Sequence, residues 1–476
     1  MNLVYVNLYN KERIIELLKI LADLKYRIFS QGSTFSYLLR NGIEAEEVKS
    51  DVYHPNIAIS SFLLGKKSKS LPSKPSLIIA DILQDEIDDT YNLILLISAA
   101  KSGIPAICKY TDYEKVKENL KLFGEIGNNL KKELMFNLYS AIAFGISKKS
   151  YEIFPYLNIT SEEITIPLKR ITKLDCGENP HQRAFLFSSL IKTKKLWENI
   201  EILNGSLNLN HIIDINKAAE LKTDIRYPAC FSIRHSNISG FASSDNIYEA
   251  FYDMISNKKC EREIFVFNCE IDSKIINKLN SLNAEAVIAS SYSQDVYKFI
   301  KDRNIKLKII KMPDIINPPQ ENDIFYFNGD FVFQDKDIFD ESQNIKLMTK
   351  RKPSIEEIKN ISFLTALSKH SKTFSSIIMS HNKMLSISQS ETTILDAIKT
   401  SIYKMNYQNI IKLDRSELMI AVDGSLDINS LNELTKLPIK IIIETGGNKE
   451  DEECIKICNS TNISLFFTKK RHFKHF

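Results

Sequence analysis

The chain opens with a short apolar run followed by an amphipathic stretch, and the same alternation returns further along. Residues 3–6 are apolar, and residues 11–24 place their apolar side chains on one face of a helix. Further buried strands are predicted at residues 76–80 and 104–108. Strands that alternate with helices indicate a doubly wound, mostly parallel sheet, which is an α/β fold.

The length of the chain indicates more than one domain. At 476 residues it exceeds what one hydrophobic core usually supports. Residues 159–167 have the composition of a linker, so we expect one domain over residues 1–160 and a second over residues 168–476. Strands predicted at residues 264–267 and 439–443 indicate that the α/β alternation continues in the second domain.

Composition excludes several classes of protein and partner. The 63 basic and 59 acidic residues are spread along the chain, so nucleic acid is not an expected partner. A run of about twenty apolar residues does not occur, so a membrane-spanning helix is not expected. Seven cysteines without metal-ligand spacing indicate reduced thiols, a cytoplasmic location and no metal site. With only 14 glycines, phosphate loops built from glycine must be few.

Two polar blocks in the second domain could carry chemistry. Gly177 to Gln182 reads Gly-Glu-Asn-Pro-His-Gln, which taken alone is typical of a turn with a helix cap. A second block places Arg234 and His235 at the end of an apolar strand. A histidine there could act as a general base beside a cation that stabilises an anion. The alternative is a strand-end histidine whose ring is satisfied by its neighbours.

A third block closes the chain. Residues 467–476 gather lysines, histidines and Arg471 after a predicted strand. Arginine can hold a phosphate group through its planar, bidentate fork. As a bare run of charges, the same residues would form a solvated tail.

These three blocks, in this order, resemble one half of a bifunctional purine-biosynthesis family. Its enzymes join a formyltransferase for aminoimidazole-carboxamide ribonucleotide (AICAR) to an inosinate (IMP) cyclohydrolase. The family's Thr-Lys-Arg-Gln-Pro-like stretch is similar to residues 348–353 here. The N-terminal region resembles the cyclohydrolase half, with residues 30–34 at the family's phosphate turn and Ala99-Ala100-Lys101 at its Ala-Ala-Lys. The resemblance covers nearly the whole chain.

The resemblance implies a fold and a pair of reactions. The first domain would be a methylglyoxal-synthase-like, doubly wound parallel sheet with cyclohydrolase activity. The second would be a larger α/β formyltransferase region of two cytidine-deaminase-like subdomains. Together they would transfer a formyl group from 10-formyltetrahydrofolate, the cosubstrate, to AICAR and then close the ring to IMP with loss of water. The family implies a homodimer, and no catalytic metal is expected.

The resemblance also assigns residues to roles. His235, with Arg234 beside it, would be the base for formyl transfer, and Lys101 would serve in ring closure. The formyltransferase would hold its nucleotide with Asn179, His181, Asn210, Asp214, Glu285 and Arg471, and its folate near Asp423 and Gly446. The cyclohydrolase would hold its nucleotide with Lys11, Gly32, Thr34, His54 and Asp89.

Several positions depart from the family's pattern. The substituted residues are Asp51, Leu83, Asp175, Arg234, Arg262 and Phe374. Among them, an acid stands where the family has an arginine before the Gly-Asn-Pro-His-Gln segment, and Phe374 stands where it has an asparagine. Two alternatives to the bifunctional enzyme therefore stay open. One is a catalytically impaired homologue that binds a nucleotide or serves as a scaffold, and the other is a transformylase with another formyl donor.

Overall fold

The computed structural model divides the chain into two compact units. It describes residues 2–49, 54–66, 71–81, 90–153, 161–189, 196–256, 260–302, 305–313, 322–338, 345–407 and 417–475. Unit 1 comprises Met1–Lys169 with Ser189–Lys192, and unit 2 comprises Arg170–Ser188 with Thr193–Phe476. Asp51, Leu83 and Asp89, which the sequence singled out, lie outside the described residues.

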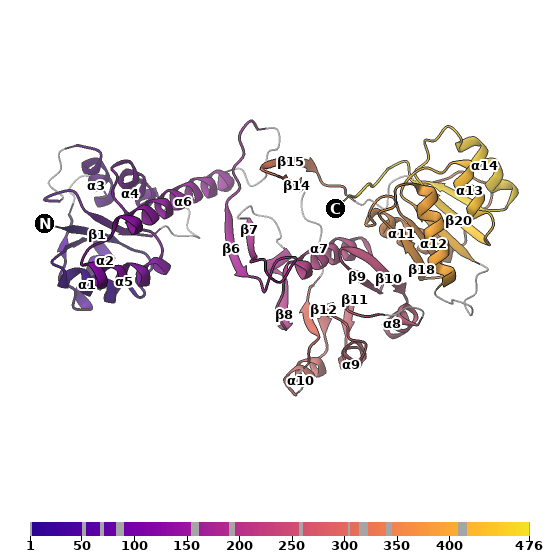
Figure 1. Ribbon diagram of the computed structural model, residues 1–476, viewed down its shortest axis with the longest axis horizontal. Helices are drawn as coiled ribbons and strands as arrows, with labels where there is room; N and C mark the ends of the chain where they lie inside the picture. The colour runs from indigo at the N-terminus through magenta and orange to yellow at the C-terminus, as the bar shows by residue number, and fades with distance from the viewer. Residues whose placement is uncertain are drawn as a thin grey trace. The chain divides into compact units, whose positions relative to one another are not determined.

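Unit 1 is built on a five-stranded sheet whose paired strands are all parallel, in the order β3-β2-β1-β4-β5 (Figure 1). This confirms the predicted α/β fold with a parallel sheet. Its methylglyoxal-synthase likeness stays a prediction. Its elements are β1 (Leu3–Asn7), α1 (Ile14–Asp23), β2 (Arg27–Ser30), α2 (Gly32–Arg40), β3 (Glu46–Glu47), α3 (Pro55–Leu63), β4 (Leu77–Ala80), α4 (Thr90–Lys101), β5 (Ala106–Ile107), α5 (Tyr113–Phe123) and α6 (Asn128–Ile153).

The apolar strands of unit 1 are buried on both faces. Val4 and Val6 of β1 pack in one apolar cluster, whereas Leu3 and Tyr5 pack in another on the opposite face. Strands covered on both sides read as continuous apolar runs, which is why β1 and β4 were visible in the sequence. The chain winds to one side of β1 through β2 and β3, and then to the other through β4 and β5. Such a reversal opens a crevice at the carboxyl ends of the strands.

Unit 2 contains a twelve-stranded sheet in which one order of elements occurs twice. The first set is β8 (Glu201–Asn204), α7 (Leu209–Asp224), β9 (Ala229–Arg234), β10 (Asn237–Ser243), α8 (Ile247–Ile255), β11 (Ile264–Ile271), α9 (Ser273–Ser281), β12 (Ala286–Tyr292), α10 (Gln294–Asp302) and β13 (Lys308–Lys311). The second set is β16 (Lys346–Leu347), α11 (Ile355–Lys369), β17 (Ser376–Ser380), β18 (Lys383–Ser388), α12 (Ile394–Tyr407), β19 (Leu418–Val422), α13 (Ile428–Leu434), β20 (Ile439–Glu444), α14 (Asp451–Ser460) and β21 (Ser464–Phe467).

The two sets are joined edge to edge. β10 pairs antiparallel with β18, so the strand order mirrors itself about this contact. In each set a hairpin is antiparallel, and three later strands are parallel to one another. The sheet of unit 2 is therefore mixed, because the tight hairpins force antiparallel pairing. The α/β class predicted for this domain is confirmed. The likeness of each set to a cytidine deaminase stays a prediction.

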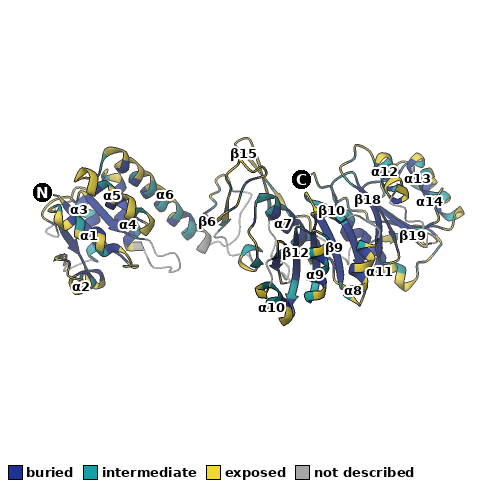
Figure 2. Cartoon of the chain, turned by 60° about the horizontal axis from the view of Figure 1, so that its bottom comes forward, coloured by how far each residue is buried: buried dark blue, intermediate teal, exposed yellow. Residues whose placement is uncertain are grey.

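Two small ribbons complete the described chain. β6 (Leu168–Lys173) pairs with β7 (Phe185–Ser189), and β14 (Asn322–Phe327) pairs antiparallel with β15 (Asp330–Asp335). The strands of the two large sheets are mostly buried, whereas the ribbons are largely exposed (Figure 2). Among the helices that the structure describes, none is long and apolar enough to cross a membrane.

Candidate functional sites in the two units

A network of buried amides lies at the carboxyl ends of β1 and β2. Asn56, fully buried, accepts hydrogen bonds through Oδ1 from the Tyr5 hydroxyl at 2.7 Å and from Gln31 Nε2 at 3.0 Å. Asn92 Oδ1 accepts from Asn56 Nδ2 and from Asn7 Nδ2, both at 2.7 Å. The network occupies the crevice edge of the parallel sheet. Sequence reasoning missed it, because isolated asparagines carry no motif.

The predicted phosphate turn lies beside this network. Gly32 opens α2 with φ +51°, in the left-handed region that favours glycine. Thr34 is buried, and its hydroxyl donates to Leu8 O at 3.0 Å and accepts from Leu8 N at 3.1 Å. Thr34 therefore fixes the β1–α1 loop against the start of α2. Lys11 of that loop is half-buried, and its Nζ donates to Tyr9 O at 3.2 Å.

His54 and Asp81 lie at the same edge. The His54 ring stacks on Tyr91 with centroids 4.0 Å apart, and its Nδ1 accepts from Asn56 N at 3.3 Å. Burial lowers the pKa of His54, so the neutral ring is favoured. Asp81 accepts from Tyr9 N at 2.8 Å through one oxygen and from Asn10 N at 2.9 Å through the other. The carboxylate of Asp81 therefore occupies two N–H groups that could otherwise face an anion.

Lys101 does not join these residues within unit 1. It is the last residue of α4 and is exposed. Because α4 connects the parallel strands β4 and β5, it runs from the carboxyl edge of the sheet back to the amino edge. At about 1.5 Å per residue, Lys101 lies roughly 14 Å along the helix from Asn92. The sequence-predicted residues Gly32, Thr34 and His54 thus share an edge that Lys101 does not.

In unit 2, His235 occupies the tight turn between β9 and β10. His235 and Ser236 both adopt positive φ, of 52° and 62°. Two successive left-handed residues are typical of the hairpin turn that joins twisted strands. Ser236 N donates to Asp214 Oδ1 at 2.5 Å, so the carboxylate on α7 anchors the turn. Arg234 and His235 are exposed at the end of a buried strand, which confirms the predicted placement.

His211, in the first turn of α7, bonds to Glu285. His211 Nδ1 accepts from Asn208 N at 3.0 Å as part of a capping box, which leaves Nε2 to donate to Glu285 Oε1 at 2.9 Å. Lys308 Nζ donates to the same oxygen at 2.6 Å. Burial alone would raise the pKa of Glu285, but the bonds from Lys308 and His211 outweigh it and lower the pKa. Glu285 is therefore ionised and already paired.

The Gly-Glu-Asn-Pro-His-Gln segment folds against the same helix. Gly177 N donates to Gln182 O at 2.7 Å, and Asn179 N donates to Gln182 Oε1 at 2.9 Å. Asn210 Nδ2 of α7 donates to Glu178 O at 3.1 Å. The exposed residues Asn179 and His181 are thereby brought to the end of α7 that also carries Asp214.

The second set of elements carries another polar cluster. Asp423 follows β19, is 3% exposed, and accepts from Thr373 Oγ1 and from Ser375 N, both at 2.8 Å. Burial raises the pKa of Asp423, although these bonds oppose the rise. Thr373 N donates to Lys474 O at 2.9 Å. The C-terminal segment is therefore pinned beside Asp423.

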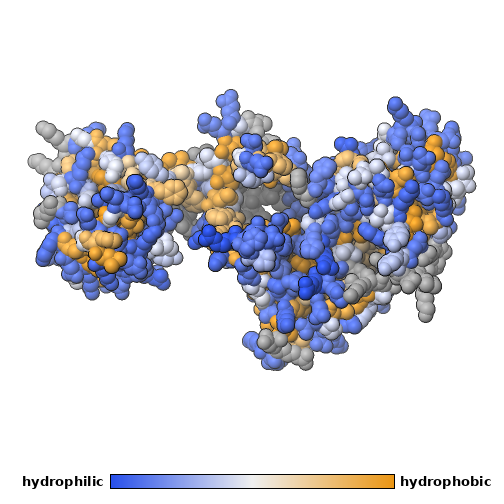
Figure 3. All heavy atoms as spheres, viewed as in Figure 1, coloured by the Kyte–Doolittle hydropathy of each residue, from blue (hydrophilic) through white to orange (hydrophobic). Residues whose placement is uncertain are grey.

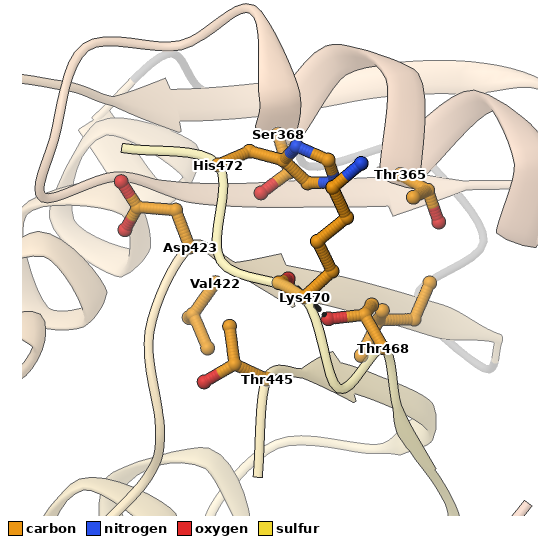
Figure 4. A pocket seen from close by; sticks show the side chains of 9 residues that line it. Thr365, Ser368, Val422, Asp423, Thr445, Thr468, Lys470 and His472 are labelled. Atoms are coloured by element: carbon orange, nitrogen blue, oxygen red, sulfur yellow. Dashed lines mark hydrogen bonds between the residues drawn. The ribbon is translucent and has the colours of Figure 1, made fainter. Parts of the chain in front are cut away.

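A pocket opens at this cluster (Figure 4). His472 and Asp423 line it from two segments, and His472 Nδ1 bonds to Asp337 Oδ2 at 2.6 Å. Gly446 lies just after β20 with φ +69°, and a Cβ there would fall 2.6 Å from Phe467 Cδ2. The lining residues are Thr365, Ser368, Val422, Asp423, Ile443, Thr445, Thr468, Lys470 and His472.

The C-terminal segment also contacts α7. Arg471 is exposed, with its guanidinium carbon 4.1 Å from the centre of the Phe473 ring. Lys474 forms an ion pair with Glu220 of α7. This places Lys474 beside the helix that carries Asn210 and Asp214. Sequence reasoning missed the α7 side of this contact, because its charged residues form no motif.

Comparison with known proteins decides the family. A model of the AICARFT/IMPCHase bienzyme family matches residues 99–404, which is more than half of the chain. The chain belongs to this family. Similar proteins named bifunctional purine biosynthesis protein PurH occur in Caldicellulosiruptor saccharolyticus and Aquifex aeolicus, each 26% identical over 99% of both chains. Another in Fusobacterium nucleatum is 25% identical over 99% of both chains. The resemblance predicted from the sequence is confirmed, and at this identity the chain is a divergent member.

Residues at positions where this AICARFT/IMPCHase member departs from the family's pattern make contacts of their own within the chain. Phe374, at the family's asparagine, packs edge-on against Phe473 with ring centroids 5.3 Å apart. Asp175, at the family's arginine, accepts from Ser206 Oγ at 2.5 Å. Arg262 adopts φ 54° in the turn before β11. Within the described ranges, no group of three or more His, Cys, Asp or Glu side chains could hold a metal ion.

Proposed function

We propose that this chain catalyses the last two steps of IMP synthesis. Unit 2 transfers a formyl group from 10-formyltetrahydrofolate to AICAR, and unit 1 closes the formylated product to IMP. The family match supports this assignment, because it extends over parts of both units and the PurH relatives align along the full chain. The observation that carries it is the exposed His235 in a turn anchored by Asp214, in a member of this family.

In formyl transfer, His235 accepts a proton from the AICAR amine while the amine nitrogen attacks the formyl carbon. His235 then returns the proton to the folate nitrogen as the bond from that nitrogen to the carbon breaks, and tetrahydrofolate leaves. Arg234 lies next to His235 and stabilises the negative charge on the formyl oxygen. The amine is a poor nucleophile, so proton removal and positioning supply most of the rate. The proposed nucleotide ligands are Asn179, His181, Asn210, Asp214, Glu285 and Arg471, with Asp423 and Gly446 on the folate side.

In ring closure, the carboxamide nitrogen attacks the formyl carbon and water leaves. The crevice edge of unit 1 offers the binding site, since Gly32, Thr34 and His54 share it. Lys11 and Asp89 complete the proposed nucleotide ligands. Within one copy of the chain Lys101 lies at the opposite edge of the sheet, so its role in ring closure requires that it reach the nucleotide of a neighbouring copy.

A homodimer is part of this proposal. Isolated two-stranded ribbons are marginally stable in water, and contiguous apolar surface marks an interaction site. Both ribbons of the described chain expose apolar side chains, and apolar atoms gather over the β6 and β7 region in Figure 3. A second copy would cover them. The exposed side chains are Leu168, Ile171, Phe185 and Phe187 on the first ribbon and Ile324, Tyr326, Phe327, Phe331 and Val332 on the second.

The formyl-transfer step is tested by replacing its proposed base. His235→Ala should lower the rate of formyl transfer from 10-formyltetrahydrofolate to AICAR by about 10² to 10⁴, the usual contribution of a general base. The repeat supplies a matched control, because His381 lies in the equivalent turn between β17 and β18 with φ 49°. His381→Ala should leave the rate unchanged. Equal rates in the wild type and His235→Ala would remove His235 from the mechanism.

A further inference from the structure

Lys217 is buried in unit 2 without a hydrogen-bond partner. It lies on α7 one turn after Asp214, is 3% exposed, and its Nζ bonds to no group among the described residues. Lys222 on the same helix is 6% exposed, but its Nζ donates to Met312 O at 2.6 Å. A buried ammonium without a partner is costly, so natural structures rarely retain one without a ligand or a function.

The groups around Lys217 add positive charge. Burial, together with the ammonium groups of Lys474 and Lys372, lowers the pKa of Lys217 to about 7, although Glu220 opposes this shift. Glu220 is already paired with Lys474. The next carboxylate along α7, Asp224, accepts from Lys369 Nζ at 2.9 Å and from the His370 ring at 2.6 Å. The nearby carboxylates are therefore occupied, and Lys217 has none of its own.

The two lysines next to Lys217 are partly exposed. The side chain of Lys474 is 31% exposed and Lys372 is partly exposed, whereas Lys217 is buried. Lys474 is three residues from Arg471, and Lys217 is three residues from Asp214, which anchors the His235 turn. Lys217 thus lies on the stretch of α7 that continues from Asn210 and Asp214, and Lys372 and Lys474 approach it from two other segments.

We propose that Lys217, Lys372 and Lys474 form a subsite for the phosphate group of a mononucleotide. The inference rests on the proposed function, because α7 presents Asn210 and Asp214 to the same nucleotide. A phosphate monoester carries close to two negative charges and three acceptor oxygens, which suits three ammonium donors. It also fits the departure at Asp175, which leaves the family's arginine position without a cation.

Calorimetric titration of the full-length protein with AICAR monophosphate, its nucleoside and inorganic phosphate tests the subsite. Lys217→Met should weaken binding of the monophosphate at least tenfold and leave nucleoside binding unchanged. Lys222→Met is the control and should bind the monophosphate like the wild type. Inorganic phosphate should raise the melting temperature of the wild type but not that of Lys217→Met. Monophosphate affinity within twofold of the wild type in Lys217→Met would overturn the proposal.

The titration should also depend on pH. Lys217 must be charged to bind phosphate, so affinity should fall as pH rises above about 7, by up to tenfold per pH unit, and Lys217→Met should lack this slope. Lys372, Lys474, Glu220 and His370 face Lys217 and remain in the variant. If Lys217 contributes to binding of the monophosphate but the protein transfers no formyl group, the subsite is supported and the proposed function is rejected. If the protein transfers the formyl group but Lys217→Met binds the monophosphate as tightly as the wild type, the proposed function is supported and the subsite is rejected.

Discussion

At the scale of single residues, Lys217 and Lys222 form a matched pair for stability. Without ligand, Lys217→Met should raise the free energy of unfolding by about 1 to 3 kcal/mol, because it removes an unpartnered buried ammonium. Lys222→Met should lower it by a similar amount, because Met312 O loses its donor. Urea denaturation at pH 7 measures both. A loss of stability in Lys217→Met would show that the ammonium is satisfied in the folded protein.

The effect of Lys217→Met on stability should depend on pH, with a definite sign. The pKa of Lys217 is lowered to about 7 in the folded chain and is about 10.5 when unfolded. Between these values the unfolded state binds more protons, so the stability of the wild type should rise with pH. The advantage of Lys217→Met should therefore be largest at pH 7 or below and shrink toward pH 10. A constant advantage across this range would contradict the lowered pKa.

Single residues also show what sequence reasoning could reach. The Arg234-His235 pair could be placed at a strand end, since the apolar run before it is buried on both faces. Lys217 could not be singled out, because the ammonium groups next to it, Lys372 and Lys474, are more than 150 residues away in the sequence. The amides Asn56 and Asn92 meet only through folding for the same reason. Contacts distant in sequence leave no local pattern.

At the scale of elements, the repeat in unit 2 was invisible in the sequence. The two sets share an order of strands and helices but few side chains. One physical equivalence persists. Asn268 in β11 accepts from Ala229 N at 2.8 Å, and Asp423 after β19 accepts from Ser375 N at 2.8 Å. Each side-chain oxygen accepts a hydrogen bond from a backbone N–H at the start of its hairpin. Either an amide or a carboxylate can do this, so the residue can be Asn in one set and Asp in the other.

Turn chemistry explains why the hairpin of β9 and β10 was not predicted. The strands at residues 229–234 and 237–243 are separated by His235-Ser236, which lacks the Asn-Gly or Gly-Gly signature of a tight turn. Without that signature, only the first of these two strands could be predicted. The left-handed conformation of two non-glycine residues is held by Asp214, a contact from another element.

The turn after β20 offers a test at this scale. Gly446→Ala should destabilise unit 2 by about 2 to 4 kcal/mol, because φ +69° disfavours a side chain and its Cβ would fall 2.6 Å from the Phe467 ring. Gly447→Ala has φ +95° but no atom within 4 Å of its Cβ, so it should lose only the backbone contribution of about 1 to 2 kcal/mol. Urea denaturation compares the two. Equal losses would show that the Phe467 ring moves freely aside.

At the scale of the whole molecule, the exposed ribbons predict a homodimer. Tyr326→Ser with Phe331→Ser removes two apolar side chains from the β14–β15 ribbon, which are 65% and 58% exposed. Light scattering should report a dimer for the wild type and a shift toward monomer for this variant. Tyr403→Ser with Tyr407→Ser, on the exposed face of α12, is the control and should remain dimeric. A monomeric wild type would contradict the proposed assembly.

The family could be predicted from the sequence, whereas the spatial arrangement of the site residues could not. Three motif blocks in a fixed order sufficed to predict the family, because each block is short and lies on a turn or strand end. The motif blocks are not enough to predict the sites, because each site brings together residues from distant segments, at α7 and at the edge of the unit 1 sheet. Lys101 illustrates the difference, because its tripeptide matches the family while the fold places it at the other edge.

Formation of IMP by the purified protein from AICAR and 10-formyltetrahydrofolate tests the central claim most directly. The account predicts that the wild type makes IMP, and that His235→Ala makes it from these substrates about 10² to 10⁴ times more slowly but still converts the formylated intermediate at the wild-type rate. Absence of IMP from either substrate, with a folded wild-type protein that binds AICAR, would contradict the account and identify the chain as a nucleotide-binding homologue without catalysis.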